Sequence, residues 1–265
     1  MGTAIGRARS WLPTIHAIGH ATKGIVYLMV GGLALLSAAG KGGKVAGEEG
    51  AVRSLGEQPF GRFLLLAAAV GLACYALWRL LVAVFNLESE RGAKGAGKRL
   101  AALASGLTHG ALSVTAFQLG LGQRAHGHEG KAKIWVAKVL DQPYGDLLVG
   151  AVGLGLIAFA IHQAYCAAVD QLPDRLDARA GKWTRIAGRV GLGARAVVFA
   201  VIGARLLKAG IDERAHNARD IGSALRELGA QPRGAALLAA VAAGLAAYGV
   251  YQLLVARHGR VPGSS

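Results

Sequence analysis

Three short motifs decide the fold: QPFG at residues 58–61, QPYG at residues 142–145 and QPRG at residues 231–234, each directly before a long apolar segment. Proline has no backbone N–H to leave unpaired, and its fixed φ suits the first turn of a helix. We predict that each proline begins an apolar helix and that the glycine two residues later lets the first turn pack closely against a neighbour. These structural marks are Pro59, Gly61, Pro143, Gly145, Pro232 and Gly234.

The apolar segments are long enough to cross a membrane. The chain has 265 residues, of which 53% are hydrophobic and only 17% charged, a composition that indicates a membrane protein. A hydrocarbon core of about 30 Å requires roughly 20 mainly apolar residues in a helix. Six candidate spans meet this requirement, at 14–40, 60–86, 100–122, 144–169, 187–209 and 233–257. The connections between them are too short to hold a folded soluble domain.

The three motifs belong to a threefold internal repeat. Gly-Leu follows twelve positions after each proline, and a ring side chain follows nineteen positions after it, as Trp78, His162 and Tyr251. Upstream, KGIVY (23–27), HGALS (109–113) and RAVVF (195–199) align with a constant offset of 86 residues. Each copy contains two spans joined by a polar connection with a short amphipathic segment, which we expect to lie on the membrane surface. The predicted membrane hairpins cover residues 14–86, 99–170 and 185–257.

Two spans in each copy return the chain to its starting side, so the copies must be parallel, with an axis along the membrane normal. The predicted fold is all-α: a polytopic bundle of six transmembrane helices, built from three parallel two-helix repeats with pseudo-threefold symmetry. Both termini then lie on the same side of a plasma (inner) membrane. Lys and Arg divide almost evenly between the two sides, and the basic residues of the odd spans favour cytoplasmic termini.

These repeated residues resemble a known family. The K/R-G-x-V-Y pattern early in the odd span, and Pro-x-Gly followed by Gly-Leu in the even span, are similar to bacterial membrane proteins known as domain of unknown function 1206, whose members carry a two-helix domain three times. The resemblance covers about residues 15–255, and it implies the architecture without implying an activity. The second copy departs most, with His109 for the basic residue and Ser113 for the tyrosine, and the third has Ala196 for the glycine.

Ionisable groups inside a membrane are costly, and they are therefore the first candidates for a functional site. In the first span four polar side chains recur at helical spacing and share one face. The corresponding positions of the other odd spans and the late positions of the even spans add further candidates. We expect the set to surround the pseudo-threefold axis, in the membrane half nearer the termini, as a positively biased vestibule. Its members are His16, His20, Lys23, Tyr27, Arg79, His109, His162, Arg195 and Tyr251.

Two other interpretations of these residues remain open. Lys23 and the arginines could instead extend their charged ends to the membrane interface while their stems cover apolar surface. His16 with His20, and His126 with His128 and Glu129, could bind a metal, but neither group has third and fourth ligands at a recognisable spacing. We therefore predict no metal site and no cofactor. The sequence contains no catalytic motif of a hydrolase, zinc protease, P-loop or dinucleotide-binding enzyme, so no enzyme is expected.

Two functions fit this pattern. The first is binding or conduction of a small solute or anion, or of an anionic lipid headgroup, through the vestibule. The second is a non-transporting membrane scaffold or a subunit of an unknown membrane-protein partner. The formal net charge is +15, but the basic residues are scattered among the connections without clustered aromatic residues, so contact with anionic lipid headgroups is expected and nucleic-acid binding is not.

Overall fold

The apolar segments fold into six long helices. The computed structural model describes residues 2–43, 45–85, 92–123, 131–172, 181–215, 218 and 220–259, and within them every regular element is helical. The long helices are α1 (Gly2–Ala38), α3 (Gly61–Phe85), α4 (Gly92–Gly120), α6 (Gly145–Ala168), α7 (Lys182–Ile211) and α9 (Gly234–His258). Each contains a segment long and apolar enough to cross a membrane. This confirms the predicted bundle of six membrane helices.

Three short helices lie in the connections inside the repeats: α2 (Glu48–Gly56), α5 (Lys131–Leu140) and α8 (Ile221–Gly229). We expected all three on the membrane surface. Instead, α2 packs among α1, α3 and α4, and α8 packs against α7 and α9. Ala51 and Val52 of α2 and Ala224 and Leu225 of α8 are fully buried. These two helices are therefore part of the core.

The Gln-Pro-x-Gly motifs form tight turns before α3, α6 and α9. The glycine N–H donates to the glutamine carbonyl oxygen at 2.8 Å in the first motif, 2.9 Å in the second and 2.7 Å in the third. The residue between proline and glycine is left-handed, with φ of 61° at Phe60, 62° at Tyr144 and 61° at Arg233. Proline second and a positive φ third define a type II turn. The helices thus begin at the glycine, two residues later than predicted.

The preceding short helix explains why glycine ends each motif. A Cβ atom added to Gly145 would lie 1.9 Å from the carbonyl oxygen of Val139, and one added to Gly234 would lie 2.0 Å from that of Gly229. No side chain fits at these distances. The turn therefore brings the start of each even span directly against the short helix, as the sequence predicted.

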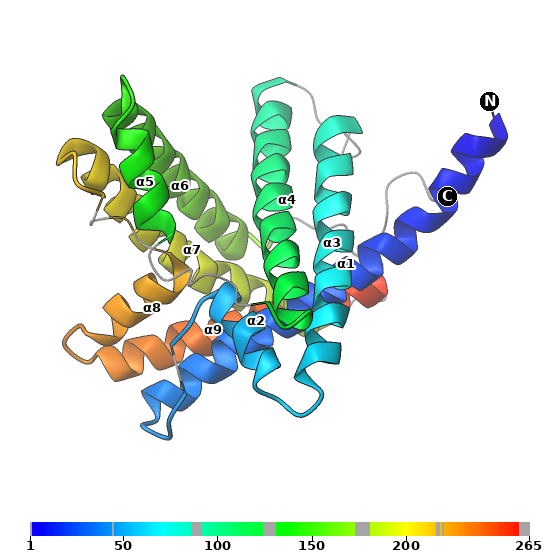
Figure 1. Cartoon of the computed structure of the whole chain (residues 1–265), viewed down its shortest axis with the longest axis horizontal. Coiled ribbons are helices and arrows are strands. Elements are labelled where there is room, and N and C mark those ends of the chain that lie inside the picture. The colour runs from blue at the N-terminus through cyan, green and yellow to red at the C-terminus, as the bar shows by residue number, and fades with distance from the viewer. Residues whose placement is uncertain are drawn as a thin grey trace.

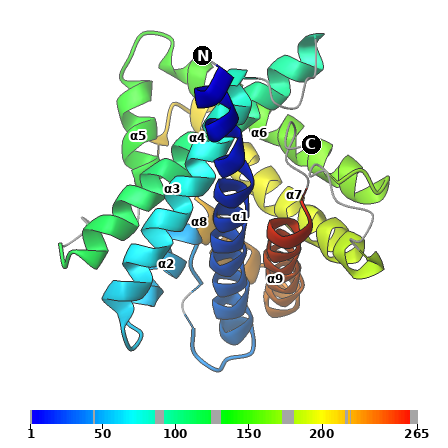
Figure 2. The ribbon, with the colours of Figure 1, turned by 90° about the vertical axis from the view of Figure 1, so that its right-hand side faces the viewer.

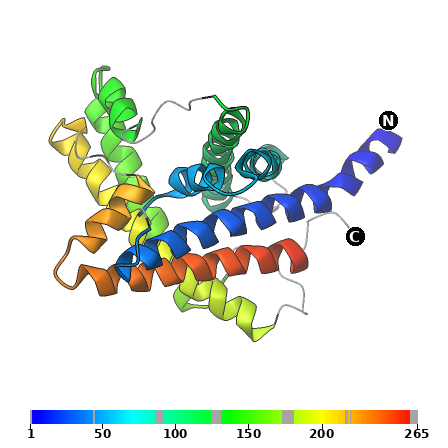
Figure 3. The same ribbon diagram turned by 60° about the horizontal axis from the view of Figure 1, so that its bottom comes forward.

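The long helices are arranged in a ring in which the first and last helices, α1 and α9, lie next to each other. The most extensive packing joins consecutive repeats, α3 with α4 and α6 with α7, while α9 of the last repeat packs along α1 of the first. Figures 2 and 3 show α1 and α9 side by side, with the start of α1 and the end of α9 at the same end of the molecule. Gly24 and Gly249 allow this contact, because a Cβ on either would lie within 2.8 Å of the other's carbonyl oxygen.

The second repeat departs from the symmetry of the other two. Within the first and third repeats the two spans pack together, α1 on α3 and α7 on α9, whereas α4 and α6 share at most marginal contact over the described residues. Figure 1 shows the α3–α4 pair diverging from the α5, α6 and α7 group. The ring is therefore open at one of its six positions.

The left-handed residues of the turns give a first test. Phe60 and Tyr144 are 86% and 81% exposed, and a left-handed conformation costs a non-glycine residue about 1–2 kcal/mol. We expect Phe60→Gly to be more stable than Phe60→Ala by about 1 kcal/mol, measured as the melting temperature of the purified protein in detergent. Both variants lack the ring, so their difference isolates the backbone conformation. Equal melting temperatures would rule out strain at this turn.

The glycine that follows gives a second test. We expect Gly145→Ala to destabilise the protein by more than about 2 kcal/mol, because overpacking of this severity forces backbone shifts. Gly155→Ala, on the same helix, is the matched control, since a Cβ at Gly155 has no neighbour within 4 Å. The control should be neutral or slightly stabilising. The measurement is the monodisperse fraction in size-exclusion chromatography together with the melting temperature, and similar behaviour of the two variants would contradict the packing argument.

Candidate functional site

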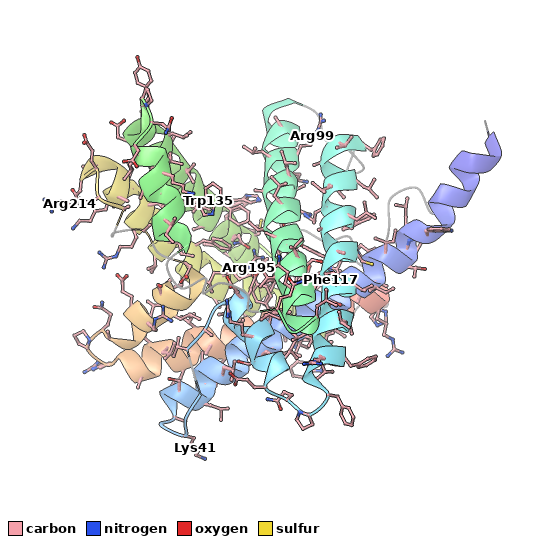
Figure 4. All side chains as sticks on the ribbon, viewed as in Figure 1. Lys41, Arg99, Phe117, Trp135, Arg195 and Arg214 are labelled. Atoms are coloured by element: carbon pink, nitrogen blue, oxygen red, sulfur yellow. The ribbon has the colours of Figure 1, made fainter. Side chains whose placement is uncertain are left out.

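The basic residues at corresponding positions of the three repeats lie in the interior. Lys23 on α1, His109 on α4 and Arg195 on α7 each stand near the middle of a candidate span. Lys23 and His109 are 4% and 6% exposed. Figure 4 places Arg195 near the centre of the molecule, whereas its other labelled basic residues, Lys41, Arg99 and Arg214, lie at the periphery. The helices extend further toward the termini than expected, so these residues do not belong to the terminus-side half.

Lys23 points inward among tyrosine rings. Its Nζ donates a hydrogen bond to the Tyr75 hydroxyl at 2.6 Å. The same nitrogen lies 4.3 Å from the ring centroid of Tyr75, 5.6 Å from that of Tyr248 and 5.9 Å from that of Tyr27, within the range of cation–π attraction. Lys23 therefore does not extend to the membrane interface.

Arg195 repeats this arrangement in the third copy. Its Nη1 donates to the Tyr248 hydroxyl at 2.7 Å, and its guanidinium carbon lies 4.4 Å from the ring centroid of Tyr248 and 5.3 Å from that of Phe199. Tyr75 and Tyr248 both stand sixteen positions after the proline of their repeats. The first and third repeats thus offset the lost hydration of a buried cation with a tyrosine hydroxyl at the corresponding position.

The second repeat lacks this partner, because Phe159 occupies the corresponding position and has no hydroxyl. His109 instead packs its ring against Tyr75, with the centroids 4.6 Å apart, and its Nδ1 lies 2.8 Å from the Ser105 carbonyl oxygen. Its Nε2 is buried without a hydrogen-bond partner and lies 3.8 Å from a carboxylate oxygen of Glu48.

Glu48 is the residue that the sequence reasoning missed. It begins α2, and its side chain is only 16% exposed. Burial by itself would raise the pKa of the Glu48 carboxyl, but His109, a hydrogen bond from Tyr27, Lys23 and Arg195 together hold that pKa below its ordinary value. The carboxylate is therefore ionised at neutral pH and faces all three basic residues.

The alignment of the repeats contained a sign of this role. Counting eleven positions back from each motif proline gives Glu48 in the first copy, Ala132 in the second and Ile221 in the third. All three copies carry a basic residue at one position, and a single copy carries an acid at another. This combination indicates that the acid is a counter-ion. Only the packing of α2 into the core shows that it reaches them.

A second polar chain extends from this cluster along α1 and α9. His20 Nδ1 lies 2.6 Å from Gln252 Oε1, and the Gln252 amide donates to the Tyr248 hydroxyl. His16 packs against His20 with ring centroids 4.2 Å apart and against Trp78 at 5.0 Å. The described residues contain no group of three or more His, Cys, Asp and Glu placed to hold a metal. His126, His128 and Glu129 lie outside the described residues.

The three predicted members on the even spans differ in their surroundings. His162 is exposed on α6, with its Nε2 3.6 Å from Cys166 Sγ. Tyr251 is fully buried and packs against Tyr248, with the centroids 6.0 Å apart. Arg79 is half-buried, and its Nε has no hydrogen-bond partner. Of the predicted set, the structure brings together His16, His20, Lys23, Tyr27, His109 and Arg195. Tyr251 lies behind Tyr248, and Arg79 is close enough to Tyr75 to interact with it electrostatically.

The charges of the cluster do not balance. Lys23 and Arg195 carry positive charge, and among the described residues Glu48 is the carboxylate that interacts with them. His109 Nε2 and Arg195 Nε are buried and lack a hydrogen-bond partner, although polar atoms inside proteins are nearly always paired. Arg195 Nε is therefore a buried donor without a partner, whereas His109, whose Nδ1 donates to the Ser105 carbonyl oxygen, has a donor at Nε2 only when its ring is protonated.

Comparison with known proteins agrees with the architecture. A family described as Domain of Unknown Function (DUF1206) matches the chain three times, over residues 18–86, 100–170 and 190–259. An uncharacterized protein of Bacillus subtilis, YxxB, is 30% identical over 254 residues, which cover 93% of this chain and 90% of that protein. No solved structure matches. The chain therefore belongs to the family Domain of Unknown Function (DUF1206), whose domain it carries in three copies.

Proposed function

We propose that this membrane protein binds a small anion, or the anionic headgroup of a lipid, at the cluster of Lys23, His109 and Arg195. The observation that carries the proposal is the convergence of these three residues, one from each repeat, in the middle of the predicted membrane spans. A buried positive charge is stable only where an opposite charge or strong hydrogen bonds offset its lost hydration. A bound anion would supply this at the cluster.

The site lies at equal sequence depth in its three helices, which suits a solute that crosses the membrane along the axis. On this proposal the protein lies in the plasma membrane with cytoplasmic termini, and the short helices of the first and third repeats border the route on the other side. Conduction would require the tyrosine, histidine and glutamine side chains that now contact one another to move apart.

The dense packing also favours a second function. Tyr75, Tyr248 and Gln252 are at most 3% exposed, and their mutual contacts give the centre of the bundle an ordered polar core. A scaffold or subunit without transport would use such a core for rigidity. It would bind no anion at the cluster, and it would co-purify with another membrane protein.

Anion binding separates the two functions. We expect sodium salts of small anions, at constant ionic strength, to raise the melting temperature of the wild-type protein in a saturable way, because a ligand that binds only the folded state stabilises it. Lys23→Met and Arg195→Met should each weaken binding about tenfold or more, since a lost charge contact of about 1.4 kcal/mol is tenfold in affinity. Anion flux into proteoliposomes should fall in the same variants.

The control is Lys138→Met, which removes the same charge from an exposed position on α5. It should bind anions as the wild type does. If the wild type shows no saturable stabilisation by any anion, or if Lys138→Met weakens binding as much as Lys23→Met, the proposed site is wrong and the scaffold becomes the better explanation.

A further inference from the structure

The cluster already holds one anion, and it belongs to the protein. Glu48 is tethered at the start of α2, and its carboxylate accepts a hydrogen bond from Tyr27 beside Lys23, His109 and Arg195. Within the part of the chain that the structure describes, Glu48 is the acid that takes part in this group, and the other repeats have no acid at the corresponding position. Glu48 thus occupies the place that charge and geometry assign to a ligand.

Glu48 is held loosely compared with another carboxylate of the same protein. Its carboxylate lies 3.8 Å from His109 Nε2, which is beyond hydrogen-bond distance. Glu227 on α8, by contrast, accepts hydrogen bonds from Arg205 Nε at 2.8 Å and 3.0 Å. A charge-assisted bond normally measures about 2.7–2.9 Å. Glu48 is therefore held near His109 by charge attraction, without the short hydrogen bonds that hold Glu227.

The unpaired donor of Arg195 points to what would replace Glu48. Arg195 Nε lies buried without a hydrogen-bond partner, while Lys23 Nζ and Arg195 Nη1 are already bonded to Tyr75 and Tyr248. His109 Nδ1 donates to the Ser105 carbonyl oxygen, so the unpaired His109 Nε2 is a donor only when the ring is protonated. A free carboxylate can approach Arg195 Nε more closely than one fixed to the backbone of α2. It would also keep the hydrogen bond from Tyr27.

From this geometry we infer that the ligand of the site is a carboxylate, and that Glu48 is an internal competitor which the ligand displaces. The inference rests on the proposed function, because it names the class of anion and the group that regulates its entry. Displacement frees the Glu48 side chain, which α2 can then present to the polar connection that precedes it. Ligand binding and withdrawal of the Glu48 side chain from the cluster are thereby coupled.

The test is rescue of Glu48→Ala by acetate. Removal of the side chain leaves the cations without their counter-ion and opens space for one small carboxylate. We expect a lower melting temperature than wild type, restored by acetate, and an acetate affinity at least tenfold above that of the wild type. Glu48→Gln keeps the volume of the side chain and removes its charge, so it should be destabilised with much weaker rescue.

Glu227→Ala is the matched control, because it also removes an ion-paired carboxylate from a short helix. Its melting temperature should respond to acetate no more than that of the wild type. Glu48→Asp retains the charge on a side chain shorter by one methylene, and it should bind acetate more tightly than the wild type even if Glu48→Ala cannot be purified.

The outcomes separate this inference from the proposed function. Equal acetate affinity in wild type, Glu48→Ala and Glu48→Asp would overturn displacement while leaving the anion site intact. Rescue of Glu48→Ala by sulfate or phosphate as effective as rescue by acetate would overturn the assignment to carboxylates. Absence of binding by any anion to the wild type and all variants would remove both proposals.

Discussion

Two permanent charges in the middle of a membrane bundle are the constraint on which the centre of this structure depends. Lys23 and Arg195 cannot be buried in hydrocarbon without partners. The first and third repeats meet the requirement identically, with a tyrosine hydroxyl and aromatic faces on the even helix of the same repeat. This pairing holds α1 to α3 and α7 to α9 at equivalent depths, and it gives the bundle its approximate symmetry.

The second repeat shows what happens when the constraint is relaxed. Histidine replaces the permanent cation and phenylalanine replaces the tyrosine, and α4 and α6 share at most marginal contact over the described residues. Glu48 from the first repeat then serves as the partner of His109. The asymmetry of the bundle and the acid at its centre thus both occur where the second repeat departs from the other two.

Close backbone approach provides the second organising force. Without a hydrophobic effect between helices inside the membrane, association depends on packing, and small residues permit it. Gly24 and Gly249 bring α1 and α9 together so that the last helix closes onto the first. The turn glycines do the same between each short helix and the even span that follows. Polar partners then meet because the backbones are near.

The sequence by itself determined the number of membrane helices, the threefold repeat and the inward face that carries His16, His20, Lys23 and Tyr27, because these depend on local composition and helical period. It could also equate Lys23, His109 and Arg195, because the repeats align at a constant offset. Only the tertiary structure decided that α2 enters the core, that Glu48 reaches the basic residues and that His162 does not. Those outcomes depend on which backbones approach across the bundle, and a one-dimensional pattern carries no information about an angle between helices or about a repeat that fails to close.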